Sequence, residues 1–559
     1  MRSAVLVSLI SLALAACQSR DSSAPAIPAV RRPATHVLAA SATPPPMAVA
    51  LAPQINGGDF LRYARVLSSD AGRRPSIRAQ AMTTRYLIEQ LRRMHLAPGN
   101  RGSWLQSVPV VATTLLNTGV SLAVSGQGGT QRFAYAKDMM VATQRPRALV
   151  TLRRSPVVFL GYGIDAPQWQ WNDYAGADVR GKTVIVLANN PRFANGGPRA
   201  FNGRGLTWYG LAAYKLEQAA RMGAAACLII HTAASAGISW QLLLRRDSGA
   251  QWSLASGAEA GPRLAVRGWL RHAAAERLFR AAGLDLDALT QQAGQPGFHA
   301  VPLDVTASIT LRNSIVHRRA DNVLGLVRGH KHPDQVVIYS AHWDLATARS
   351  GTGLASLLEI ADAFAHQKTP PDRSVLFLMP ARGEAGLLGS RYYVAHPVFP
   401  LARTVADLNI DAWPILGRAR DITVIGAGQS QLEDELHQVL APEGRVISPE
   451  TTAQNGLYFR SDELSFARAG VPALIVGPGL DLIEGGHAAG LAAAAAYMAP
   501  RAGRSIVAPA GDLSGTLEDI ETLYLLGRRL ADSDAWPNWY ADSIFRPRRD
   551  AMMSRAARR

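Results

Sequence analysis

Residues 336–390 decide the fold and read VVIYSAHWDLATARSGTGLASLLEIADAFAHQKTPPDRSVLFLMPARGEAGLLGS. The β-branched apolar run at 336–339 predicts a buried strand, and the leucines between 354 and 358 lie at helical spacing behind it. A second apolar run at 375–379 predicts another buried strand. Strand, helix and strand in this order are typical of a parallel sheet covered by helices. We therefore predict an α/β fold with a mixed, mainly parallel sheet sandwiched by helices.

Polar side chains follow both predicted strands. His342 and Asp344 come directly after the first strand, and Glu384 follows the second. In parallel sheets, reactive and binding residues gather where strands end at their carboxyl edge. Imidazole and carboxylate groups are also ligands that zinc prefers. Each residue alone would pass for an ordinary polar residue at the end of a loop, so the prediction of a site depends on the three together.

The length and charge of the chain limit the number of domains and the kinds of partner that can be expected. At 559 residues the chain is too long for one ordinary core, which predicts two or more domains. A formal charge of +17 raises the question of nucleic-acid binding. The sequence has no zinc knuckle, no basic helix and no alternation of aromatic and basic residues, so we predict no nucleic-acid partner. A solvated basic surface, facing anionic lipid or polymer, is the preferred interpretation.

The first residues predict the compartment. Arg2 precedes an apolar run at 4–14 that is too short to span a membrane, and the run ends in LAAC at Cys17. This pattern resembles a bacterial lipoprotein signal with lipid attached to Cys17. Gln18, rather than Asp, then implies an outer-membrane lipoprotein that faces the periplasm. The alternative is a plain secretory signal in which the cysteine occurs by chance.

Composition sets the expected domain boundaries. The stretch after Cys17 is rich in Ala, Pro and Ser, so it cannot bury a core. Near residue 150 the sequence pattern changes to one that predicts strands and turns. We expect a lipoprotein signal at 1–17, a disordered tether at 18–52, the first part of the main domain at 53–149, a smaller α/β insert at 150–312, the main part at 313–545 and a loose basic tail at 546–559.

Longer motifs resemble the MH-clan zinc aminopeptidases, a family that includes leucyl aminopeptidase-like and glutamate carboxypeptidase-like peptidases. The matching motifs are SAHWD at 340–344, GTGLASLLEIA at 351–361, GEAGLLGSRYY at 383–393, NID at 409–411 and FRSDELSFARAGVPAL at 459–474. The insert resembles a protease-associated domain in GYGIDAP at 161–167 and NDYAGADVRGKTV at 172–184. The resemblance covers about residues 60–540 and implies a metalloexopeptidase that removes N-terminal residues from peptides.

The resemblance also implies a ligand set. In that family two zinc ions share a bridging carboxylate and a water molecule. Carried over residue by residue, His342, Glu384 and Asp411 match zinc ligands. Asp344 matches the carboxylate that orients the histidine from behind the metal.

Other positions depart from the family. The general-base glutamate is replaced by Gly383, and the shortened loop that would carry the bridging aspartate has Arg349 near that place. The terminal histidine motif reads Tyr-Met-Ala-Pro at 497–500. Loss of a general base costs about a hundred- to ten-thousand-fold in rate. Zinc sites need three or four protein ligands each, so we expect zinc to be reduced to one ion or none.

Two residues could compensate. A guanidinium group can grip two carboxylates and stays charged, so we predict that Arg349 replaces the metal pair by bridging Glu384 and Asp411. The alternative is that Arg349 points into solvent. His487, in a Gly-rich stretch, is a candidate substitute ligand that would join His342 and Asp411 on one zinc, although an exposed histidine is the simpler interpretation.

Three functions remain open. The preferred one is a cell-envelope lipoprotein on the aminopeptidase fold, with catalysis lost or very weak, that binds peptides or acts as a scaffold (a pseudopeptidase). The alternative is an active periplasmic metallo-aminopeptidase with a rearranged one-zinc site. The third is an envelope structural protein that docks to anionic polymer, which only composition supports. The sequence specifies neither a substrate side chain nor an oligomeric state.

Overall fold

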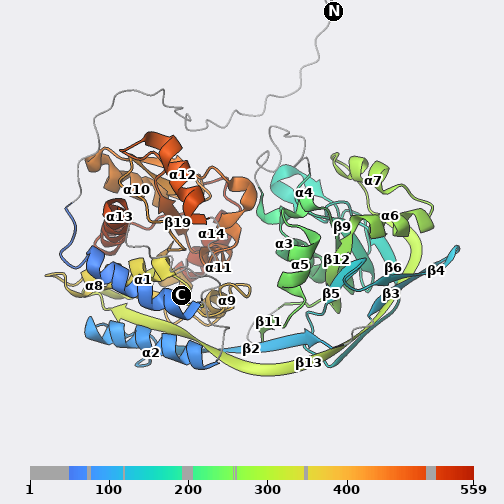
Figure 1. Cartoon of the computed structure of the whole chain (residues 1–559), viewed down its shortest axis with the longest axis horizontal. Coiled ribbons are helices and arrows are strands. Elements are labelled where there is room, and N and C mark those ends of the chain that lie inside the picture. The colour runs from blue at the N-terminus through green and yellow to red at the C-terminus, as the bar shows by residue number, and fades with distance from the viewer. Residues whose placement is uncertain are drawn as a thin grey trace, which may run out of the picture. The chain divides into compact units, whose positions relative to one another are not determined.

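Two groups of strands share one long strand, β13 (Val301–Val327), in the computed structural model of the chain (Figure 1). The C-terminal half of β13 pairs with β2 (Leu105–Leu115) and β15 (Arg373–Met379), and its N-terminal half pairs with β3 (Ser121–Gly126) and β6 (Leu149–Phe159). We call the two groups the first and the second sheet. The structure describes residues 50–71, 77–116, 120–191, 206–255, 257, 261–344, 351–498 and 512–558.

The first sheet has a parallel centre. β14 (His332–Ser340) lies between β15 and β16 (Thr404–Asn409) and is parallel to both, and β16 is parallel to β19 (Ala473–Pro478). Antiparallel pairs flank this centre through β13 on one side and β17 (Asp421–Val424) on the other. The prediction of a mixed α/β sheet with a parallel core is confirmed. The remaining strands are β1 (Ala97–Pro98), β11 (Gln251–Leu254) and β18 (Val446–Pro449).

Helices bury both faces of the first sheet. Successive residues of β14 point to opposite faces, and each face packs into an apolar cluster. Val337 and Tyr339 pack into one apolar cluster, and Val336 and Ile338 pack into another. The helices that contribute to the first cluster are α1 (Gly57–Ala71), α2 (Ile77–Arg93), α8 (Gly351–Ala365), α10 (Leu432–Leu440) and α13 (Ser514–Ala531). Those that contribute to the second are α9 (Leu388–Ala395), α11 (Glu463–Ala469) and α14 (Arg546–Ala557), while α12 (Gly486–Met498) follows β19.

The second sheet begins earlier in the chain than we expected. Its strands are β3, β4 (Gly129–Ala134), β5 (Met139–Ala142), β6, β9 (Thr183–Leu187), β10 (Ala226–His231), β12 (Val266–Arg271) and the first part of β13. The expected boundary at residue 150 is therefore too late. Leu122 and Phe133 are buried in the core of the second sheet, and this burial determines to which sheet their strands belong.

Short elements complete the second sheet. Its helices are α3 (Ala212–Arg221), α4 (Ala233–Ala236), α5 (Trp240–Asp247), α6 (His272–Ala281) and α7 (Leu286–Ala293), and a two-stranded ribbon joins β7 (Asp165–Ala166) to β8 (Trp171–Asn172). That this part is a protease-associated domain remains a prediction.

The C-terminal segment is a docked helix, so the expected loose basic tail is wrong. Arg549 of α14 is 2% exposed and donates hydrogen bonds to the carbonyl oxygens of Leu401 (3.3 Å) and Thr404 (3.1 Å). These bonds compensate for burying the guanidinium group and hold the helix against the body of the protein.

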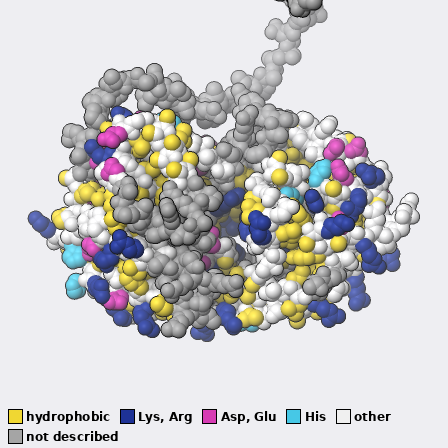
Figure 2. Space-filling model, viewed as in Figure 1, with side chains coloured by type: hydrophobic (Ala, Val, Ile, Leu, Met, Phe, Trp, Pro, Cys, Tyr) yellow, Lys and Arg dark blue, Asp and Glu magenta, His cyan; other side chains and the backbone are white. Residues whose placement is uncertain are grey.

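Two expectations concern membranes and surface charge. The predicted signal, Cys17 and nearly all of the predicted tether lie outside the described residues. Within the described residues, no helix has the length and apolarity that a membrane span needs. Lys and Arg side chains are spread in many small groups over the face shown in Figure 2.

Candidate functional site

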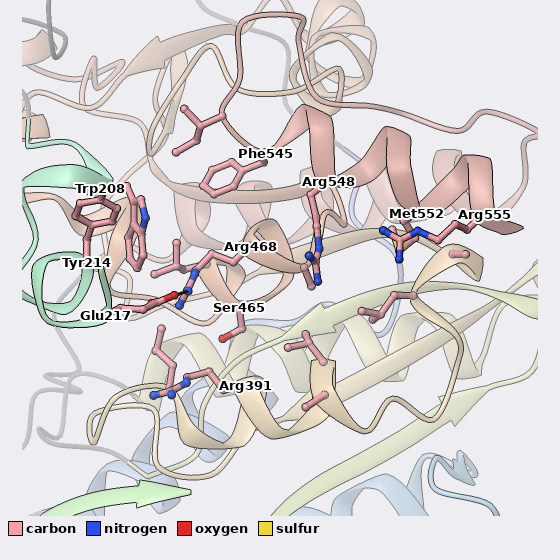
Figure 3. Close-up of a pocket in the computed structure, with 18 of the residues that line it drawn as sticks. Trp208, Tyr214, Glu217, Arg391, Ser465, Arg468, Phe545, Arg548, Met552 and Arg555 are labelled. Atoms are coloured by element: carbon pink, nitrogen blue, oxygen red, sulfur yellow. Dashed lines mark hydrogen bonds and ion pairs between the residues drawn. The ribbon is translucent and has the colours of Figure 1, made fainter. Parts of the chain in front are cut away.

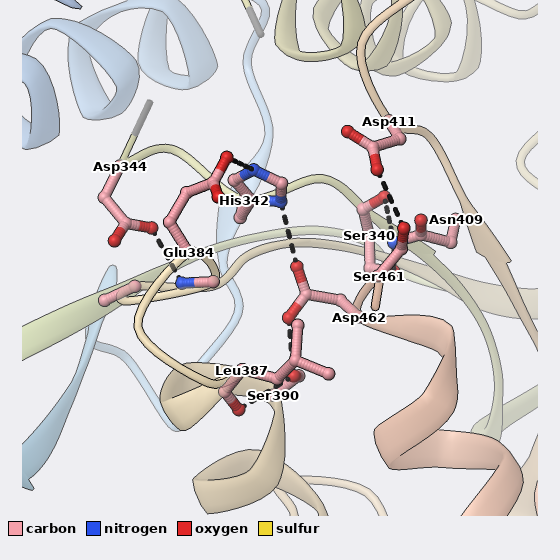
Figure 4. Close-up of polar contacts among 12 residues, drawn as sticks. Ser340, His342, Asp344, Glu384, Leu387, Ser390, Asn409, Asp411, Ser461 and Asp462 are labelled. Carbon is pink, nitrogen blue, oxygen red and sulfur yellow. Dashed lines mark hydrogen bonds and ion pairs between the residues drawn. The ribbon is translucent and has the colours of Figure 1, made fainter. Parts of the chain in front are cut away.

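The site lies at the carboxyl ends of three parallel strands. His342 follows β14, Glu384 follows β15 and Asp411 follows β16, and neighbouring parallel strands end at the same edge. Figure 4 shows the three side chains in this region, with Asp462 from the start of α11 beside them. The expectation that these strand ends lie together is confirmed by the strand pairing.

His342 lies between two carboxylates. Its Nδ1 is 3.2 Å from Oδ2 of Asp462, and its Nε2 is 3.8 Å from Oε1 of Glu384. Burial by itself lowers the pKa of His342, but the two carboxylates outweigh it and raise that pKa well above its usual range. The imidazole side chain is only 10% exposed, whereas the Glu384 side chain is 49% exposed.

Asp462 is the partner that sequence reasoning missed. Its side chain is fully buried, and its second oxygen accepts a 2.5 Å hydrogen bond from Ser390 of α9. Ser465 in turn lies 2.9 Å from the hydroxyl of Ser390. The available signal was the position of Asp462 in the motif at 459–474, directly before a helix.

Asp344 contacts Gly383. The carboxylate of Asp344 accepts a 2.8 Å hydrogen bond from the backbone N–H of Gly383, and burial raises its pKa to about 7. Asp462 accepts the described hydrogen bond from Nδ1 of the His342 ring, so Asp462 has the orienting contact that the family resemblance assigns to Asp344. Asp344 instead fixes the loop that carries Gly383 and Glu384.

Gly383 packs directly against His342. A β-carbon at residue 383 would lie 2.7 Å from Cγ and 2.8 Å from Cβ of His342, closer than real β-carbons approach other atoms. The position that the resemblance assigns to the general base therefore has no room for any side chain in this arrangement.

Asp411 is held by hydrogen bonds of its own. One oxygen accepts a 2.8 Å bond from the hydroxyl of Ser461, and the other accepts a 2.7 Å bond from the backbone N–H of Ala412. Nearby, Glu463 is completely buried, and burial raises the pKa of its carboxyl group well above the usual range.

Residues 322–500 match the sequence profile of peptidase family M28. The matched segment makes up about a third of the chain. The M28 segment contains His342, Gly383, Glu384 and Asp411, so all the residues predicted at the three strand ends lie inside it.

Two curated relatives align with parts of the chain. Transferrin receptor protein 1 of Gallus gallus is 28% identical over 121 residues, which are 20% of this chain and 16% of the relative. The aminopeptidase NAALADL1 of Mus musculus is 32% identical over 127 residues, which are 21% of this chain and 17% of the relative. The chain thus spans less than a fifth of the length of either relative.

Two solved structures also align with the chain. The aminopeptidase from Aneurinibacillus sp. strain AM-1 aligns over 87% of this chain and 96% of its own, with a TM-score of 0.47 and 16% identity. The zinc aminopeptidase of Bacillus subtilis aligns over 86% of this chain and 98% of its own, with a TM-score of 0.38 and 16% identity.

The similarity to family M28 implies a zinc site, and the described side chains show whether such a site fits here. Nε2 of His342 is buried without a hydrogen-bond partner among the described residues, and Glu384 lies next to it. These two groups are suitable donors, but a protein zinc site needs three or four. Within the described ranges, no group of three or more His, Cys, Asp or Glu is arranged to hold an ion. The described donor set therefore does not fit the two-zinc site that the resemblance implies.

The remaining candidate residues are Arg349, His487 and Cys17. Arg349 lies in the stretch 345–350, outside the described residues, so its predicted bridge between Glu384 and Asp411 stays a prediction. His487 is exposed in the first turn of α12. Cys17 also lies outside the described residues.

Proposed function

We propose that this protein is a peptide-binding member of family M28 in which hydrolysis is lost or very weak. The contact between Gly383 and the ring of His342 supports this proposal most strongly, because it leaves no space for a general base at residue 383. Removal of a positioned base costs about a hundred- to ten-thousand-fold in rate.

The hydrogen bonds of the remaining polar groups also support the loss of hydrolysis. Asp411 is occupied by Ser461 and by the backbone of Ala412, and Nδ1 of His342 is occupied by Asp462. We propose that zinc is reduced to one ion or none in this protein.

Peptide binding needs an accessible polar group. The Glu384 side chain is half-exposed, and its carboxylate can pair with the charged α-amino group of a peptide. We therefore assign to Glu384 the recognition of peptide N-termini. The acetylated form of a peptide, which lacks that charge, is expected to bind more weakly.

The proposed location is the cell envelope. The LAAC pattern that ends at Cys17 supports a lipoprotein anchored in the outer membrane and facing the periplasm. Metabolic labelling with a fatty acid is expected to label the wild-type protein and not Cys17→Ala, and label on both would refute the assignment.

A one-zinc metallo-aminopeptidase is the second candidate. The buried, unpartnered Nε2 of His342 beside Glu384 supports it, because two suitable donors already face each other. A third donor would have to complete the set. Asp411 and the exposed His487 are the candidates for this donor.

One purified sample separates the candidates. We expect at most one zinc per chain by elemental mass spectrometry, and no release of nitroaniline from a panel of aminoacyl p-nitroanilides. Stoichiometric zinc with turnover that a chelator abolishes would establish the second candidate and refute the first.

Peptide recognition has its own measurement. Fluorescence anisotropy with a C-terminally labelled peptide pool is expected to show tighter binding of the free-amine pool than of the acetylated pool. Glu384→Gln should remove that difference, whereas the exposed control Glu484→Gln should preserve it. Equal binding of both pools to the wild-type protein would contradict the role of Glu384.

A further inference from the structure

A cleft away from the His342 site is lined by the second sheet's helix α3 and by α9, α11 and α14. Its volume is about 1190 Å³. Pockets for small molecules are usually about 300–1,000 Å³, so this cleft is large enough for an elongated ligand. Figure 3 shows Trp208 and Tyr214 on one side of it and α14 on another.

The lining of the cleft is strongly basic. Two carboxylates, Asp165 and Glu217, face six arginines. The carboxylate of Glu217 is already used, because Arg468 binds both its oxygens at 2.6 and 2.7 Å and stacks on the ring of Trp208. The arginines that line the cleft are Arg221, Arg391, Arg403, Arg468, Arg548 and Arg555.

The charge of three of these arginines is not neutralised by a carboxylate among the described residues. Arg221, Arg548 and Arg555 have no ion pair with any carboxylate in the described ranges of the chain. Arg548 reaches from α14 towards α9 in Figure 3. Guanidinium groups bind carboxylates through two parallel hydrogen bonds, so these side chains suit a ligand with several carboxylates.

The cleft also has apolar lining between the charges. Val394 of α9, Leu401, Ile544 and Met552 of α14 contribute to it, next to Phe545. A uniformly charged polymer would leave this apolar surface without a partner. A peptide with both acidic and apolar side chains matches the two kinds of surface at once.

The chain's own N-terminal segment does not fit by charge. Residues 18–49 contain three arginines, Arg20, Arg31 and Arg32, and a single carboxylate, Asp21. A net positive segment would be repelled by the arginines of the cleft. The complementary occupant must come from another molecule.

We propose that this cleft binds an acidic peptide segment of another protein, with carboxylates on the arginines of α3 and α14 and apolar side chains on Ile544, Phe545 and Met552. The cleft is separate from Glu384 and does not depend on hydrolysis. A chain of hydrogen bonds nevertheless connects it to the candidate site, since Ser465 lines the cleft and contacts Ser390, which donates to Asp462.

The test uses the whole folded protein and a defined probe. The probe is a fluorescent ten-residue peptide of alternating Glu and Leu, acetylated and amidated so that no free amine can reach Glu384. We expect saturable binding by fluorescence anisotropy that weakens with salt, and much weaker binding of the matching Gln–Leu peptide. Saturable binding that is equal for both peptides would refute charge recognition.

Paired variants locate the binding surface. The double variant Arg548→Gln/Arg555→Gln is expected to weaken binding about five- to twentyfold, as for two partly screened charge contacts. The control Arg132→Gln/Arg280→Gln removes the same charge from exposed positions of the second sheet and its helix α6 and should bind like the wild type. An equal loss in both double variants would mean that general surface charge attracts the peptide, and would overturn the proposal.

Other anionic partners are distinguished in the same assay. Polyphosphate and vesicles rich in phosphatidylglycerol serve as competitors. If they displace the peptide and the Arg548→Gln/Arg555→Gln variant loses their binding more than peptide binding, the occupant is a polymer or membrane and the peptide assignment is wrong. Failure of these competitors at matched charge concentration supports the peptide.

Discussion

A β-carbon at Gly383 would lie 2.7 Å from Cγ of His342. This close contact connects two loops that follow neighbouring parallel strands, β15 and β14. It requires a glycine for packing at the position where the family resemblance implies a catalytic glutamate. This contact predicts how substitutions at residue 383 affect stability and hydrolysis.

Gly383→Ala is expected to lower the free energy of unfolding by about 1–3 kcal/mol, because the new methyl group displaces the His342 ring. Thermal unfolding followed by circular dichroism measures this. The control is Gly249→Ala, since a β-carbon there meets no atom within 4 Å. An Ala variant as stable as the wild type would show that the ring moves freely.

Gly383→Glu is expected to leave hydrolysis undetectable. The added carboxylate restores the side chain of a base but meets the same steric conflict with His342, and it supplies no bridging ligand. The aminoacyl p-nitroanilide panel measures turnover. Measurable activity from this single change would show that the metal site is more complete than proposed.

Asp462→Asn is expected to destabilise the protein by about 3–5 kcal/mol, because it removes the buried partner of a buried histidine. The pKa of His342 should fall at the same time, since Asp462 helps to raise it. Urea unfolding and an NMR pH titration of the imidazole measure the two effects. The comparison variant, Glu384→Gln, alters a half-exposed partner and should cost less than about 1 kcal/mol.

The buried carboxyl group of Glu359 in α8 is expected to make the free energy of unfolding depend on pH. Burial raises its pKa from 4.5 to about 8, and one of its oxygens accepts a 2.9 Å hydrogen bond from the backbone N–H of Asn56. The folded protein therefore keeps a proton that the unfolded chain releases. The stabilisation from this group is complete below pH 4.5 and is lost as the pH rises through about 8.

Glu359→Gln cannot ionise and can still accept the bond from Asn56. Its melting temperature relative to the wild type is expected to rise between pH 5 and pH 9. The exposed control Glu89→Gln should show a difference that does not change with pH. A constant difference for Glu359→Gln as well would mean that this carboxyl group is ionised throughout.

Arg549→Gln should loosen α14 from the body of the protein. The substitution leaves the carbonyl oxygens of Leu401 and Thr404 without their donor, at a cost of about 1–3 kcal/mol. Hydrogen exchange of the amides at 546–557 should become faster. The exposed control Arg558→Gln should leave exchange unchanged, and equal exchange in both variants would show that other contacts hold the helix.

Much of the first sheet was predictable. The apolar runs at 336–339 and 375–379 became parts of β14 and β15, because strands buried on both faces consist of continuous apolar residues. Strand ends in a parallel sheet share an edge, so the common location of His342, Glu384 and Asp411 followed as well. These inferences needed only local patterns and one rule of topology.

The sequence by itself determined the class of the sheet, the strands that end at the site and the loss of a side chain at Gly383. Tertiary structure alone decided that Asp462, 120 residues away in the chain, contacts His342, that residues 121–142 join the second sheet and that the basic C-terminal segment docks as a helix. Periodicity records whether a residue is buried, but it does not record which distant residue lies against it. Such partners are selected only when the whole chain packs, because packing closes the contact and excludes water from it.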